Sequence, residues 1–167
     1  MAQAIAAGKL VPFRDPLGWD GAGRTFLMCA GLISQMDAAR AVTDVKQIAR
    51  WERLNADIAH FVGNGYINWN MMKWLDPRRF EHWELRSVRP RPSIRVFGRF
   101  AAPDVFVATH AVERALLGAK WDVRWEIEKL VCEDEWHLAL GDEPPFSADD
   151  YTHYITQNAS KDVRLDP

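Results

Sequence analysis

WELRSVRPRPSIRVFGRFAAPDVFVATHAV, residues 83–112, is the stretch that decides the fold. It contains three short runs rich in β-branched and aromatic residues, WELRSV, PSIRVFGRF and DVFVATHAV, and such runs favour β-strands. Proline and aspartate separate the runs, in RPRP and AAPD, where these residues favour turns. Three strands joined by such short connections predict an antiparallel meander.

The segments on either side of the meander have helical spacing. Residues 34–62 carry apolar side chains at spacings of three and four, which indicates one or two amphipathic helices. SQMD at 34–37 has the pattern of a capping box, and GNG at 63–65 favours a helix end. Residues 116–140 return to the helical period, and SADD at 147–150 predicts the start of a short terminal helix.

Two segments before the meander are less clearly patterned. RTFLMCAGLI, residues 24–33, fits either a buried strand or the lead-in to a helix, and we favour the strand. Residues 66–81 are aromatic and partly helical in pattern, and Pro77 interrupts them. We therefore expect an α+β fold, in which a three- to four-stranded antiparallel sheet packs against N-terminal helices and is followed by additional C-terminal helices.

Length and composition indicate one folded domain. The chain has 167 residues, of which 48% are apolar, enough for a hydrophobic core. We expect a single domain over residues 1–167, with an irregular N-terminal segment at 1–23, a core at 24–115 and a helical extension at 116–167. Cys29 and Cys132 lack metal or redox spacing, so we interpret them as buried apolar residues. The start resembles neither a signal peptide nor a membrane anchor, which predicts a cytoplasmic protein without membrane contact.

Charge is unevenly distributed along the chain, although its formal net value is only -2. Residues 73–99 hold eight basic and three acidic side chains, whereas residues 122–150 hold ten acidic and two basic ones. Two local fields of opposite sign attract different partners. Glu133, Asp134, Glu135 and His137 do not share a helix face, so we expect no metal site.

Alternation along the strands places the arginines of the meander in two groups. In PSIRVFGRF, Ile94 and Val96 share one face with the other even-numbered positions, and we expect that face to pack on the helices. The opposite face is expected to be open and to hold Glu84, Arg86, Arg95, Phe97, Arg99 and His110. Arginines that bind phosphate beside aromatic rings that stack bases would suit RNA. The alternative is an ordinary solvated sheet face, with Arg89 and Arg91 in an exposed turn.

These strands also resemble those of a known family, the RelE/HigB-type toxins of bacterial toxin–antitoxin pairs, in particular the phage-derived, HigB-like branch. WELR at 83–86, IRVF at 94–97 and ATHAV at 108–112 are similar to that family's motifs and occur in the same order. The resemblance implies a RelE-like core at 24–115 and a ribosome-dependent endoribonuclease that needs no metal and no cofactor. In such an enzyme the 2′-hydroxyl of the messenger attacks the adjacent phosphate. Its partners would be RNA, including ribosome-bound messenger, and an antitoxin protein.

Roles for individual residues follow from the resemblance. Arg86 and Arg95 would clamp phosphate, His110 would act as the acid or base, and Glu84 would take part or orient an arginine. Further contacts to RNA are expected from Arg99, Phe97, Arg89, Arg91 and Arg114.

The chain departs from the family after the last strand. Where the family has a Lys-Lys-Thr segment, this sequence reads VERALLG, in which Arg114 is the basic residue. Two alternatives therefore stay open. One is a non-catalytic RNA- or protein-binding protein on the same scaffold, encoded by a phage or mobile element, because fold does not determine function. The other is an unrelated small α+β enzyme or structural subunit.

Overall fold

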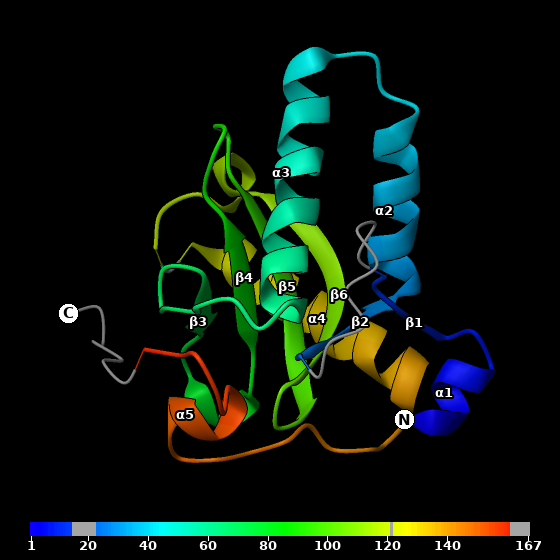
Figure 1. Ribbon diagram of the computed structural model, residues 1–167, viewed down its shortest axis with the longest axis vertical. Helices are drawn as coiled ribbons and strands as arrows, with labels where there is room; N and C mark the ends of the chain where they lie inside the picture. The colour runs from blue at the N-terminus through cyan, green and yellow to red at the C-terminus, as the bar shows by residue number, and fades with distance from the viewer. Residues whose placement is uncertain (15–22, 121, 161–167) are drawn as a thin grey trace.

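The computed structural model describes residues 1–14, 23–120 and 122–160. Its centre is a six-stranded mixed sheet with the strand order β1-β2-β6-β5-β4-β3 (Figure 1). The strands are β1 (Leu10–Pro12), β2 (Thr25–Cys29), β3 (Met72–Trp74), β4 (Trp83–Ser87), β5 (Ile94–Ala102) and β6 (Val105–Glu113).

The predicted meander forms one half of this sheet. β4 pairs antiparallel with β5, and β5 pairs antiparallel with β6. β3 extends the antiparallel part beyond β4, whereas β2 runs parallel to β6 and β1 runs antiparallel to β2. The α+β class is confirmed, but the sheet is larger than the three or four antiparallel strands expected, and it is mixed. β1 and β3 have three residues each, too few for alternation to reveal them.

Two helices cover one face of the sheet. They are α2 (Ala30–Arg40) and α3 (Val45–Val62), which lie together in front of the strands in Figure 1. Leu54, Ile58 and Phe61 of α3 are buried, and they belong to the same cluster as the strand residues Trp83, Leu85, Ile94, Val96 and Phe100. This is the helix-facing core that the alternation predicted.

A third long helix, α4 (Val123–Leu140), packs on the opposite face (Figure 1). Cys132 packs with Phe97, and Trp136 packs with Val107. Every residue from Ile94 to Phe100 is consequently buried. The expectation that the arginine-bearing face is open is wrong, because α4 has apolar residues that cover it. Cys29 and Cys132 are buried, unpaired thiols, as predicted.

A β-bulge in β6 decides which face His110 occupies. Gly98 pairs with Ala108 and Phe97 pairs with His110, so Thr109 is an extra residue in the ladder. An extra residue shifts the alternation by one, and His110 therefore joins Phe97 on the side of α4, while Ala108 lies in the core under α2 and α3. Gly98 permits the close approach at this point, since a Cβ there would lie 2.3 Å from the carbonyl oxygen of Val107.

The N-terminal segment is more regular than residues 1–23 were expected to be. α1 (Ala2–Ala6) and β1 occupy its described part. Leu10 of β1 is buried against Leu27 and Trp136, so packing on α4 and β2 orders this segment. The expectation for positions 15–22 lies outside the described residues.

Helix boundaries agree only partly with the predicted caps. Ser34 and Asp37 lie inside α2, so a capping box at 34–37 is wrong; β2 leads directly into the helix at Ala30. α3 begins after Asp44, whose carboxylate accepts from the backbone N–H of Lys46 at 3.0 Å. The predicted terminal helix is α5 (Tyr151–Tyr154). Residues 66–81 form β3 and the 3₁₀ turn η1 (Arg78–Phe80) in place of an α-helix.

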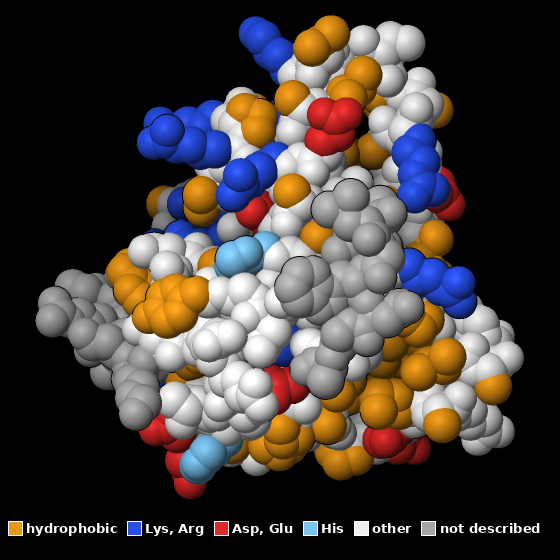
Figure 2. All heavy atoms as spheres, in the orientation of Figure 1, with side chains coloured by type: hydrophobic (Ala, Val, Ile, Leu, Met, Phe, Trp, Pro, Cys, Tyr) orange, Lys and Arg blue, Asp and Glu red, His pale blue; other side chains and the backbone are white. Residues whose placement is uncertain are grey.

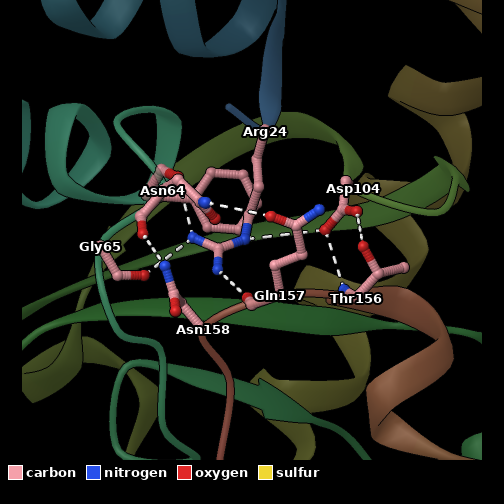
Figure 3. Close-up of polar contacts among 8 residues, drawn as sticks. Arg24, Asn64, Gly65, Asp104, Thr156, Gln157 and Asn158 are labelled. Carbon is pink, nitrogen blue, oxygen red and sulfur yellow. Dashed lines mark hydrogen bonds and ion pairs between the residues drawn. The ribbon is translucent and has the colours of Figure 1, made fainter. Parts of the chain in front are cut away.

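Arg24 joins four segments on the side of the sheet that carries α3 (Figure 3). One guanidinium nitrogen donates to the carbonyl oxygens of Phe61 at 3.1 Å and Gly65 at 2.9 Å, and another donates to that of Gln157. Its Nε lies 3.7 Å from the carboxylate of Asp104 in the β5–β6 turn. Asp104 in turn accepts from the backbone N–H of Thr156 at 3.0 Å. The contacts hold the loop after α3 and the C-terminal segment against the sheet.

Within the described residues, no helix has both the length and the apolar composition needed to cross a membrane.

Candidate nucleic-acid interface

An arginine-lined cleft lies at the end of the sheet where β4 turns into β5. Arg91, Arg95, Arg114 and Ser93 contribute to its walls, with the apolar residues Val88, Pro92 and Ala115, and its volume is about 670 Å³. Figure 2 shows Lys and Arg side chains gathered at the upper left of the molecule, where Figure 1 places the β4–β5 hairpin. A concave surface with three guanidinium groups is suited to an anionic ligand.

Strand register brings these arginines together. Arg86 of β4 stands opposite Arg95 of β5. The backbone N–H of Arg114 donates to the carbonyl oxygen of Ser93 at 2.7 Å, which holds the end of β6 and the following 3₁₀ turn η2 (Arg114–Leu117) against the hairpin. Arg89 and Arg91 are exposed in the turn itself. Side chains that are up to 28 positions apart in the chain, from Arg86 to Arg114, thus lie at one end of the sheet.

Glu84 is the buried anion beneath these arginines. Its carboxylate lies 3.2 Å from Nε of Arg95 and 3.4 Å from Nε of Arg86. Burial raises the pKa of Glu84, and the two arginines oppose that effect. Burial also lowers the pKa of Arg95 to about 10, so this guanidinium stays protonated at neutral pH. Glu84 therefore positions Arg95 at the floor of the cleft and pairs with Arg86 of the neighbouring strand.

The local charge of the cleft is positive despite the acidic residue that precedes Arg114. Glu113 forms an ion pair with Arg50 of α3 at 3.1 Å, so its charge is compensated by a cation outside the cleft. The guanidinium of Arg114 donates to the carbonyl oxygen of Gly118 at 2.6 Å and lies 5.4 Å from the ring centre of Trp125. These contacts fix the position of the Arg114 guanidinium at the wall of the cleft, which suits phosphate binding.

His110 does not lie in this cleft. Its ring is stacked on Phe97, with centroids 5.2 Å apart, and only 5% of its surface is exposed. Its Nδ1 lies 3.0 Å from the hydroxyl of Thr109 and its Nε2 lies 3.0 Å from the carboxylate of Glu128 on α4. Burial lowers the pKa of His110 to about 4, so the ring is neutral at pH 7.

Arg99 and Phe97 also lie beneath α4. Arg99 is buried, donates to the carbonyl oxygen of Phe80 at 2.6 Å and lies 5.6 Å from the ring centre of Trp136. Phe97 belongs to a buried cluster with Leu117 and Cys132. Of the predicted site residues, the structure thus brings together Glu84, Arg86, Arg91, Arg95 and Arg114, with Arg89 beside them, and separates Arg99, Phe97 and His110 from that group.

Sequence reasoning missed a second, smaller cleft on the other side of Glu84. It has a volume of about 80 Å³, and Lys73, Lys120, Lys129 and Glu84 are among its lining residues. Lys73 stands opposite Glu84 in the β3–β4 ladder, so recognition of β3 would have found it. Lys120 and Lys129 come from the region of α4, and no pattern in the sequence linked that acidic helix to the strand.

The chain was compared with family models, curated proteins and solved structures. No family model, no curated protein and no solved structure matches the chain. In the described residues, no group of three or more His, Cys, Asp or Glu side chains could hold a metal ion. Function must therefore be argued from the cleft itself.

Proposed function

We propose that this protein binds single-stranded RNA through the arginine cleft and does not cleave it. The observation that carries the proposal is the convergence of Arg91, Arg95 and Arg114 on one concave surface. Guanidinium groups bind phosphate oxygens bidentately, so Arg89, Arg91 and Arg114 can follow successive phosphates of a flexible strand, above Arg95, which is paired with Glu84 at the floor of the cleft. Arg89, exposed beside the cleft, extends the cationic surface.

The position of His110 favours binding over cleavage. Cleavage by a RelE/HigB-type enzyme, which the sequence motifs suggested, would require an acid or base at the phosphate. His110 lies under α4 and is engaged with Thr109 and Glu128, away from the residues that line the arginine cleft. The alternative hypothesis is that the protein is a member of the RelE/HigB-type toxins and cleaves RNA.

Binding can be measured by fluorescence anisotropy of a labelled single-stranded RNA at several salt concentrations. The Arg91→Gln, Arg114→Gln double variant should bind about tenfold more weakly or worse, because two charge-assisted phosphate contacts are lost. For about three phosphate contacts, the slope of log K against log salt should be near -2 for the native protein and shallower for the variant. Arg40→Gln is the matched control, since Arg40 is an exposed arginine of α2 outside the cleft.

Three results would contradict the proposal. Equal affinity of the native protein and the double variant would exclude the cleft as the binding surface. Equal weakening by Arg40→Gln would indicate non-specific attraction. RNA cleavage, alone or with ribosomes, that disappears in His110→Gln would support the ribonuclease instead.

A further inference from the structure

The outer surface of α4 carries a row of exposed apolar side chains. Val123 is 67% exposed, Ile127 50%, Leu130 59% and Leu138 69%, and Val131 lies beside them at 36%. Their spacing of four, three, one and seven residues keeps them within one face of the helix. We call this set of five residues the outer stripe.

The outer stripe is separate from the residues that dock α4 on the sheet. The docking side consists of Lys129, Cys132, Trp136 and Ala139, all of which are buried. α4 is therefore apolar on two opposite sides, and the sheet uses one of them. Leu116 of η2 is also exposed, by 61%, and its carbonyl oxygen accepts from the Arg124 side chain at 3.2 Å. Single exposed apolar residues are ordinary, but five on one face of one helix indicate an interaction surface.

Charge around the outer stripe specifies the kind of partner. Asp134 is exposed in the middle of the row, and the side chain of Glu126, 56% exposed, lies at its border. Arg124 is the exposed cation among the α4 residues. A second copy docked through the same surface would place these acidic groups against one another, which opposes self-association.

We infer that the outer stripe of α4 binds an amphipathic helix of a partner protein, whose apolar residues cover Ile127, Leu130 and Leu138 and whose flanking Lys or Arg residues face Asp134 and Glu126. Helix-on-helix packing of this kind needs anchors at three and four spacing, which the outer stripe provides. None of the five residues of the outer stripe lines the arginine cleft, so the two surfaces can be tested with separate substitutions.

The test uses the full chain and two synthetic helical peptides with the same leucine face, one flanked by lysines and the other by glutamates. Labelled peptide is titrated with protein and followed by anisotropy. The lysine peptide should bind at least about tenfold more tightly than the glutamate peptide. Ile127→Ser combined with Leu130→Ser should weaken binding of the lysine peptide by a similar factor, because the apolar contact is lost.

Val45→Ser is the matched control, since Val45 is an apolar residue of α3 that is 76% exposed. It should leave peptide affinity unchanged, and the α4 double variant should keep native RNA affinity, which separates this inference from the proposed function. Equal affinity for both peptides, or unchanged binding to the α4 double variant, would overturn the inference. A concentration-dependent dimer in sedimentation that the α4 double variant abolishes would also overturn it, because the occupant would then be a second copy.

Discussion

Arg24 illustrates how one buried side chain can connect segments that are distant in sequence. Its guanidinium contacts Phe61, Gly65, Gln157 and Asp104 (Figure 3), and only 1% of the side chain is exposed. Three of the four contacts are backbone carbonyl groups, which would lose their donor if the charge were removed. Such a group is costly to leave unsatisfied in a buried position.

Replacement of Arg24 by methionine should therefore lower the free energy of unfolding by about 2 to 4 kcal/mol. Urea denaturation at pH 7 measures the change. Arg40→Met is the control, because Arg40 is 75% exposed and pairs with Asp37 on the same helix; it should change stability by less than about 0.5 kcal/mol. Equal effects of the two substitutions would mean that the buried contacts of Arg24 contribute nothing specific.

At the scale of elements, strand length decided what the sequence could predict. β4, β5 and β6 have five, nine and nine residues, long enough for alternation to appear, and they were predicted with the correct pairing. β1 and β3, with three residues each, gave no such signal. Tertiary contacts hold these short strands in place. In β1, for example, Leu10 packs against Leu27 and Trp136.

The part of the candidate site that lies on β4 and β5 could also be predicted from the sequence. Alternation correctly placed Glu84, Arg86 and Arg95 on one face, because β4 and β5 pair without a break over these residues. It could not show that α4 covers Arg99 and His110, since α4 has apolar residues on two sides and the sequence does not say which side docks. The extra residue at Thr109 was equally invisible, because a bulge has no strict sequence pattern.

β1 offers a direct test of whether the N-terminal element stabilises the fold. Leu10 is 1% exposed and its neighbour Val11 is 39% exposed. Leu10→Ala should lower the free energy of unfolding by about 2 to 4 kcal/mol, because it removes buried methyl groups and leaves a cavity beside Trp136. Val11→Ala, on the same strand, should cost less than about 1 kcal/mol. Similar small losses for both variants in urea denaturation would show that β1 is not coupled to the rest of the fold.

At the scale of the whole molecule, α4 brings acidic side chains to a sheet face that carries basic and imidazole groups. His82 lies 3.1 Å from the carboxylate of Glu133, and His110 lies 3.0 Å from that of Glu128. Both glutamates belong to α4 and both histidines belong to the sheet layer. The basic segment 73–99 and the acidic segment 122–150 thus contact each other in the interior of the protein, through His82 and Glu133.

Acidic pH should lower the free energy of unfolding, because His82 and His110 are buried in their neutral form. Burial lowers the pKa of His110 to about 4 and that of His82 to about 3, whereas an unfolded histidine has a pKa of about 6.5. As the pH falls below about 6.5, the unfolded chain takes up protons that the folded protein excludes, so each histidine lowers the free energy of unfolding by up to about 1.4 kcal/mol per pH unit. The loss for His110 continues until the pH reaches its folded pKa of about 4.

His110→Gln should accordingly show a shallower loss of stability than the native protein in urea denaturation between pH 7.5 and 5, with a difference in slope that approaches about one proton near pH 5. His153→Gln is the control, because His153 is exposed on α5 and should leave the slope unchanged. Identical slopes for the native protein and His110→Gln would mean that His110 takes up its proton in the folded state as readily as in the unfolded one. Only a steeper loss of stability in His110→Gln than in the native protein would mean that Glu128 stabilises the imidazolium and holds α4 more firmly at acidic pH.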